Sequence, residues 1–296
     1  MMPRPPEQVP PPYSTIEELK FKWAADVKIS ETHEINKREI QDALFALAEK
    51  LSFAVFDGAS GPPAGEIVAR MARDEMAKAV LKLPDNLSLE ETINSFMEIY
   101  AEAQKKILKA GKENKEWKGM ATTATVIRVV RTPDGKKRAV IANAGDSRVC
   151  ILRAGKRVLE EITRDNTVYN DIQTANGKTE QEILENQSRI SNISDRSQLD
   201  PKEQRMLRQW GDMLSNGLGG DEISNFSAKP DIYTPEINEG DMVLIFTDGV
   251  GKKFTDMQIA QIILEEKEPK AIVKRLVHSP PYPDDTAGAA FTLLAA

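Results

Sequence analysis

The sequence predicts an α+β fold in which antiparallel sheet is covered by helices on its outer side. Short apolar runs rich in β-branched and aromatic residues alternate with longer segments that carry apolar side chains at helical spacing. Several of the short runs are joined by connections of only a few residues, which antiparallel neighbours can use and parallel ones cannot. No segment repeats, so these elements are expected to share one mixed core.

Two segments differ in composition from the rest of the chain. Residues 1–13 are rich in proline and are predicted to form a flexible leader outside the fold. Residues 164–212 are polar, poor in aromatic side chains and contain two sequences typical of helix starts. They are predicted to form a helical insertion over the β core. Residues 14–296, insertion included, are predicted to form a single domain.

The N-terminal part of this domain predicts one strand and two long helices. Residues 51–56 form a short apolar run of β-type residues that ends at an Asp-Gly pair. Residues 64–83 and 88–110 carry apolar side chains every three or four positions, the spacing of one helix face. Ser88 and Glu91 form a capping-box sequence at the start of the second helix.

The middle of the chain predicts a meander of antiparallel strands. Runs of β-type residues separated by short turn sequences span 121–130, 138–144, 148–153 and 157–162. After the insertion, a core strand is predicted over 241–247. A helix capped by Thr255 and a last strand over 289–294 follow it.

The composition disfavours several classes of partner. The chain has 296 residues with 40 Lys and Arg against 46 Asp and Glu, a formal net charge of −6. Nucleic acid is an unsuitable main partner for this acidic balance, because phosphate contacts need clustered basic side chains. No window approaches the roughly 18–20 apolar residues of a membrane span, and no targeting segment is recognisable. Cys150 is the only cysteine, so no disulfide can form within the chain. This fits the reducing cytoplasm, where the protein is expected to lie.

Histidine is scarce, which narrows the possible chemistry. The two histidines are His33 and His278. Zinc hydrolases use two or three imidazoles, and catalytic triads usually need a histidine base, so both classes are disfavoured. Asp and Glu are abundant, which favours an enzyme that works with carboxylates and hard metal ions.

Carboxylates stand at the ends of the predicted core strands. They occur at Asp57-Gly58, Gly145-Asp146, Asp248-Gly249, Asp284-Asp285 and Asp42. Carboxylates gathered at one rim would repel each other unless a cation lay between them, and Mg²⁺ or Mn²⁺ binds such oxygen ligands. Asp-Gly is also a common hairpin dipeptide. The residues alone therefore leave two interpretations open, a metal site and a set of turns.

The order of these motifs resembles the metal-dependent protein phosphatase 2C family, its bacterial branch in particular. The matching segments run from about residue 20 to the C-terminus and are Gln41-Asp42, Asp57-Gly58-Ala59-Ser60-Gly61, Ala121-Thr122-Thr123-Ala124, Gly145-Asp146-Ser147-Arg148, Thr163-Arg164-Asp165, Asn216-Gly217-Leu218-Gly219, Thr247-Asp248-Gly249 and Asp284-Asp285. The resemblance implies an α-β-β-α sandwich of two antiparallel sheets flanked by helices. It also implies a two-metal site at one end and makes the 164–212 insertion the family's flap.

Carried over by position, the resemblance implies a ligand set for two ions of Mn²⁺ or Mg²⁺. Asp57 would bridge both metals, and Gly58 would offer its backbone carbonyl to the second. Asp248 and Asp284 would complete the ligands of the first metal. The water activated between the metals held by Asp57 and Asp248 would attack phosphorus in line with the leaving oxygen.

Further residues surround this centre in the implied site. Asp42 would hold a metal-bound water, and Asp146 would help to bind a third, looser ion. The family's phosphate-binding arginine is replaced by Lys37, with Arg38 next to it, so one of these two cations would bind the phosphate. The histidine proposed as general acid in some members is Ala59 here, which leaves a metal-bound water as the expected proton donor.

The implied activity is that of a signalling hydrolase, a phosphatase acting on phosphoserine and phosphothreonine in proteins. Its expected partners are phosphorylated proteins, through a cognate kinase or its substrates, and the chain is expected to be a monomer. Two alternatives stay open. Lys37, Gln41 and Ala59 depart from the family pattern and would suit a pseudophosphatase that serves as a binding module. In the second alternative, the acidic residues lie in turns of an unrelated α+β hydrolase or scaffold.

Overall fold

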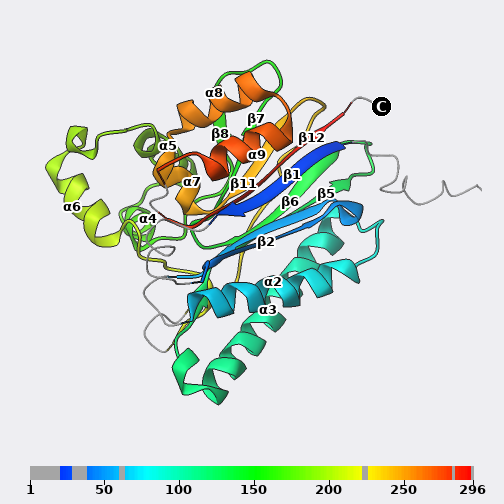
Figure 1. The fold of residues 1–296 in the computed structure, drawn as a ribbon, viewed down its shortest axis with the longest axis vertical. Helices are drawn as coiled ribbons and strands as arrows, with labels where there is room; N and C mark the ends of the chain where they lie inside the picture. Colours follow the sequence, from blue (N-terminus) through cyan, green and yellow to red (C-terminus); the bar gives the residue numbers. More distant parts are fainter. Residues whose placement is uncertain (1–20, 29–38, 60–63, 222–225, 282–283, 295–296) are drawn as a thin grey trace, which may run out of the picture.

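The computed structural model describes residues 21–28, 39–59, 64–221, 226–281 and 284–294. Two five-stranded antiparallel sheets face each other, and helices cover both outer faces (Figure 1). The α-β-β-α sandwich predicted from the sequence is thereby confirmed. The predicted leader, residues 1–13, lies outside the described residues. Within the described part of the chain, no helix is long and apolar enough to cross a membrane.

The two sheets are built from strands that are distant in sequence. The first sheet has the order β1 (Phe21–Lys28), β12 (Thr286–Leu293), β11 (Met242–Phe246), β7 (Arg148–Leu152) and β8 (Leu159–Glu161). The second has the order β10 (Asp231–Tyr233), β6 (Lys137–Ala144), β5 (Ala124–Arg131), β3 (Ser52–Asp57) and β2 (Asp42–Leu47). A short pair, β4 (Ala121–Thr122) with β9 (Leu218–Gly219), lies outside both.

The single meander predicted over 121–162 is wrong at its centre. Strand β5 pairs with β6, and β7 pairs with β8, but β6 and β7 belong to different sheets. The Gly145-Asp146 turn carries the chain from one sheet to the other. Gly145 has a φ of +126°, and a Cβ there would lie 2.5 Å from the Thr123 side chain. The turn thus packs against the second sheet instead of closing a hairpin.

Helices cover the outer faces as the sequence predicts. Helices α2 (Gly65–Leu81) and α3 (Leu89–Glu113) pack on the second sheet, and α8 (Asp256–Glu266) and α9 (Pro269–His278) on the first (Figure 1). The short helix α7 (Asp248–Lys253) directly follows β11. The predicted capping box is present: the Ser88 N–H donates to Glu91 Oε2 at 2.8 Å, and the Glu91 N–H donates to Ser88 Oγ at 3.2 Å.

The core between the sheets follows the two-residue period of the strands. Along β3, Phe53 and Val55 point into the space between the sheets, whereas Ala54 and Phe56 point toward α2 and α3. The Phe53 ring stacks on Phe291 of β12, with ring centroids 5.0 Å apart and an interplanar angle of 11°. Both faces of the strand are therefore buried, which explains why its sequence is a continuous apolar run.

The insertion forms a helical flap with a small core of its own. It contains α4 (Val168–Ala175), α5 (Glu180–Ser191) and α6 (Pro201–Trp210), which meet at Tyr169, Leu199 and Leu207. The two expected helix starts are capped by Thr179 and Asp200. The flap projects from one end of the sandwich, beside α7 (Figure 1). The predicted helical insertion is thus confirmed.

Replacing Phe53 by alanine is expected to lower the free energy of unfolding by about 3–5 kcal/mol, because a large, fully buried ring is lost between the sheets. Urea unfolding followed by circular dichroism measures the change. Val158→Ala, at a side chain that is 78% exposed, should change it by less than about 0.5 kcal/mol. Equal losses for the two variants would contradict this account of the core.

Candidate active site

Two strand ends bring Asp42 and Asp57 together. Asp42 begins β2 and Asp57 ends β3, and the antiparallel register places them directly opposite each other. The main chain of Asp57 is fixed by Thr123, whose N–H donates to the Asp57 carbonyl at 2.8 Å and whose Oγ1 accepts from the Asp57 N–H at 3.0 Å. This double contact ends the ladder between β3 and β5 and holds Asp57 at the rim of the sheet.

A hydrogen bond through Thr247 joins this rim to the other sheet. Thr247 Oγ1 donates to Asp42 Oδ2 at 2.7 Å and accepts from the Ala287 N–H at 3.0 Å. All three residues are fully or almost fully buried. Because Thr247 immediately precedes Asp248, the contact also fixes where helix α7 begins relative to Asp42.

Two glycines allow the backbone to pass through this crowded end. A Cβ on Gly58 would lie 2.2 Å from the Gly65 carbonyl oxygen, and a Cβ on Gly249 would lie 2.0 Å from that of Asp285. Asp57-Gly58 leaves β3 beside the first residue of α2, and Asp248-Gly249 opens α7. Neither pair closes a hairpin, so the interpretation of these Asp-Gly pairs as simple turns is wrong.

The acidic pair before β12 has two different roles. Asp285 is buried, and its Oδ2 accepts a 2.7 Å hydrogen bond from the Gln41 N–H. Asp284 Oδ1 accepts from the Asp285 N–H at 2.9 Å, while Asp284 Oδ2 accepts from Lys252. Asp285 thus fixes the backbone before Asp42, and Asp284 faces the site.

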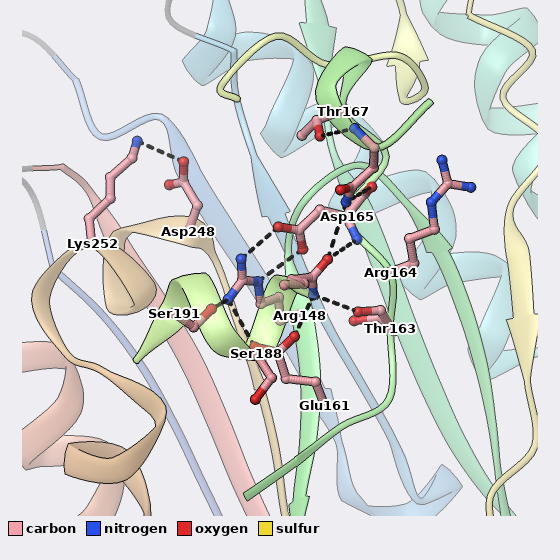
Figure 2. A network of polar contacts seen from close by, with 12 residues as sticks. Arg148, Glu161, Thr163, Arg164, Asp165, Thr167, Ser188, Ser191, Asp248 and Lys252 are labelled. Carbon is pink, nitrogen blue, oxygen red and sulfur yellow. Dashed lines mark hydrogen bonds and ion pairs between the residues drawn. The ribbon is translucent and has the colours of Figure 1, made fainter. Parts of the chain in front are cut away.

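Lys252 places its ammonium between two of the predicted metal ligands. Its Nζ lies 2.6 Å from Asp248 Oδ2 and 2.5 Å from Asp284 Oδ2. Figure 2 shows the side chain extending from the end of α7 to Asp248. Burial alone would lower the pKa of Lys252, but the two carboxylates raise it well above its ordinary value. The sequence analysis missed this residue, although a lysine four positions after Asp248 on a helix was a detectable signal.

The other candidate ligands are crowded by negative charge. The pKa values of Asp42, Asp57 and Asp146 are all raised, first by burial and then by neighbouring negative charges. For Asp57 the neighbours are chiefly Asp42 and Asp248, followed by Asp146. A bound cation would relieve this mutual repulsion.

The donor chemistry of this cluster fits a hard divalent cation. All candidate ligands are oxygens, and Asp248 Oδ1 is a buried atom without a hydrogen-bond partner. Within the described ranges, no three histidine, cysteine or acidic side chains form a ready-made metal site. The Lys252 ammonium between Asp248 and Asp284 also opposes a metal at that pair.

The cluster opens into a cavity of about 550 Å³ between the sandwich and the flap. Its lining includes Asp57, Ala59, Asp146, Asp248, Lys252, Asp284 and, from the flap, Arg208 and Asp212. The structure therefore brings Asp57, Asp146, Asp248 and Asp284 to one pocket, with Asp42 behind them. The predicted phosphate-binding pair, Lys37 and Arg38, lies outside the described residues. Arg208 is a basic lining residue that the sequence analysis missed.

A network around Arg148 ties the flap to the first sheet (Figure 2). Arg148 Nε and Nη2 donate to Asp165 at 2.9 and 2.6 Å, and Nη1 donates to Ser191 of α5 at 2.6 Å. Nη1 also contacts Glu161 at 3.2 Å. Burial raises the pKa of Asp165 to about 6 and that of Glu161 to about 7, although Arg148 opposes both shifts. The motif residues Arg148 and Asp165 thus position the flap beside the cavity.

Comparison with known proteins agrees with this geometry. The sequence pattern of the family described as protein phosphatase 2C matches residues 30–268, which is most of the chain. The chain belongs to the protein phosphatase 2C family. This confirms the resemblance and excludes an unrelated hydrolase or scaffold.

Individual relatives of this phosphatase 2C chain are distant. The probable protein phosphatase 2C 20 of Arabidopsis thaliana is 27% identical over 76% of this chain and 68% of its own length. The protein phosphatase PhpP of Streptococcus pneumoniae is 24% identical over 71% of each. The solved serine/threonine phosphatase PstP/Ppp of Mycobacterium tuberculosis has a TM-score of 0.67 at 20% identity, covering 93% of this chain and 99% of that one. The shared fold is therefore retained at low identity.

Because burial raises the pKa of Glu161 from its ordinary 4.5 to about 7, the folded state binds a proton more tightly than the unfolded state. The stability from this group is present below about pH 4.5 and is lost as the pH rises toward 7. Glu161→Gln should remove this loss. The difference in free energy of unfolding, Glu161→Gln minus the unmodified chain, should therefore increase by on the order of 1–3 kcal/mol from pH 5 to pH 8.

Urea unfolding at several pH values measures this difference. Glu160→Gln is the matched control, because the neighbouring glutamate on β8 is 49% exposed and pairs with Arg153. Its pH dependence should follow that of the unmodified chain. A parallel pH dependence for Glu161→Gln would contradict the assignment.

Proposed function

We propose that this chain is a metal-dependent protein serine/threonine phosphatase that hydrolyses phosphoserine and phosphothreonine. The observation that carries the proposal is the convergence of Asp57, Asp146, Asp248 and Asp284, from four separate segments, on one cavity beside the flap. Family membership supports the reaction class. A related fold, the catalytic domain of PstP, has been solved in complex with two manganese ions, at 20% identity and a TM-score of 0.64.

In this proposal the carboxylates hold Mn²⁺ or Mg²⁺, as two ions with a third more loosely bound. Asp57, the Gly58 carbonyl, Asp248 and Asp284 form the inner set, and Asp42 and Asp146 form the outer set. When bound, the metals supply positive charge that polarises the attacking water and neutralises the phosphoryl oxygens. The hydrogen bond from Thr247 keeps Asp42 oriented toward this centre.

The chain's own side chains then set up the reaction around the phosphate. Arg208 of the flap lies along the cavity and provides a guanidinium for the phosphoryl oxygens. Lys37 or Arg38 is proposed for the same role on the other side. Ala59 lines the cavity and has no proton to give, so the leaving serine or threonine oxygen takes its proton from water.

A second candidate function is a pseudophosphatase, a phosphoprotein-binding module without turnover. Lys252 supports it, because its ammonium lies between two carboxylates that a working centre needs for metal. Ala59 supports it as well, since a candidate acid is lost. In either case the proposed partners are phosphorylated proteins, including a cognate kinase or its substrates. We also propose a cytoplasmic, monomeric protein.

Asp57→Asn should abolish Mn²⁺-dependent phosphate release from a phosphothreonine peptide, with a loss of at least about 10²-fold in kcat. The substitution removes the negative charge of a proposed metal ligand at nearly constant size. Asp74→Asn, on the exposed side of α2, is the matched control and should keep full activity. Full turnover in Asp57→Asn, or undiminished turnover with a chelator, would refute the phosphatase proposal. No turnover in the unmodified chain with Mn²⁺ would favour the pseudophosphatase.

Arg208→Gln should raise KM for the same peptide about threefold to tenfold, because a charged contact to phosphate is lost. The effect on kcat should be smaller, since the metals are not touched. Arg205→Gln on the same helix α6 is the control and removes an equal charge from an exposed position outside the cavity lining. Equal KM values for the two variants would remove Arg208 from the proposed site.

A further inference from the structure

We propose that Lys252 is a built-in competitor for divalent metal, whose ammonium must leave the Asp248–Asp284 pair before a cation binds there. The proposal rests on the metal centre of the proposed function but not on turnover. It assigns this chain a lysine that tunes how readily the metal site at the Asp248–Asp284 pair fills.

The Lys252 ammonium lies between two of the proposed metal ligands. Lys252 Nζ contacts one oxygen of Asp248 at 2.6 Å and one of Asp284 at 2.5 Å. These carboxylates come from different parts of the chain, the start of α7 and the segment before β12. The ammonium therefore bridges them as a metal ion would. A divalent ion at about 2.1 Å from the same oxygens would lie almost on top of the ammonium, so the two exclude each other.

The carboxylate cluster is only partly neutralised. Lys252 contacts Asp248 and Asp284, whereas Asp57 and Asp42 face each other across β3 and β2. Asp248 also has one oxygen, Oδ1, that is buried and has no partner. The part of the cluster around Asp57 thus remains suited to a cation. An ion binds there without hindrance, whereas an ion at the Asp248–Asp284 pair competes with Lys252.

Lys252 has room to move. Its side chain is 35% exposed, and its flexible four-carbon stem extends from the end of the short helix α7. It lines two cavities, the one that contains Asp57 and a neighbouring one that contains Asp165 and Arg148. The ammonium can therefore swing out of the Asp248–Asp284 pair into open space when a metal takes its place.

Calorimetric titration with Mn²⁺, without substrate and at constant pH and ionic strength, tests the proposal. Lys252→Gln should bind Mn²⁺ at its weaker site at least about tenfold more tightly than the unmodified chain. Lys253→Gln removes the same charge one residue away and is the matched control. The Lys253 ammonium donates to the Val277 carbonyl of helix α9 at 3.0 Å. This control should change the affinity by less than about twofold.

Unchanged affinity in Lys252→Gln would overturn the proposal, as would equal tightening in both variants, which would reflect net charge alone. If circular dichroism shows that Lys252→Gln is unfolded, Lys252→Met provides a second test, because its side chain has a similar length and no charge. Phosphopeptide hydrolysis by the same samples separates this proposal from the proposed function. Tighter Mn²⁺ binding without turnover would support Lys252 as a competitor for metal and refute the phosphatase proposal. Turnover with unchanged Mn²⁺ binding would support the phosphatase proposal and refute Lys252 as a competitor.

Discussion

The constraint on which this structure depends is the crowding of carboxylates at one end of two packed sheets. Burial and mutual repulsion raise the pKa values of Asp42, Asp57 and Asp146, so gathering these charged groups lowers the stability of the folded chain. The apolar layers between and outside the sheets supply the stability that offsets this cost. The hydrogen bond from Thr247 to Asp42 then couples the rims of both sheets, so neither can shift without disturbing the site.

The flap is coupled to the same end through a second charged network. Arg148 at the start of β7 binds Asp165 with two hydrogen bonds and reaches Ser191 of α5. The cavity between flap and sandwich is thus lined by one wall from the rigid β core and one from a small helical unit. In the proposed function, substrate selectivity would depend on the flap, because the proposed metal ligands come from the sandwich and Arg208 comes from α6.

Much of the fold could be predicted because its elements carry local patterns. The apolar run ending at Asp57 marks β3, and the box of Ser88 and Glu91 marks the start of α3. The carboxylates at strand ends likewise indicated an oxygen-ligand site. The order of the motifs along the chain, which matches the phosphatase 2C family, indicated which of these carboxylates converge. The prediction failed where pairing is not local. The turn at Gly145 looks like a hairpin turn in sequence, but it crosses between the two sheets.

Residue order and periodicity thus determined the central strands, the helices α2, α3 and α8, the helical insertion and the set of candidate ligands. They did not indicate the strands β1, β2 and β10 or the helix α9. Only the tertiary structure decided which sheet each strand joins. Both faces of β7 are apolar and buried, so its sequence does not show which strands it pairs with. The tertiary structure alone also placed Lys252 between Asp248 and Asp284. Asp284 lies 32 residues after Lys252 in the sequence, and it reaches α7 only because β12 pairs with β11. An ion pair across such a distance leaves no periodic signal in sequence.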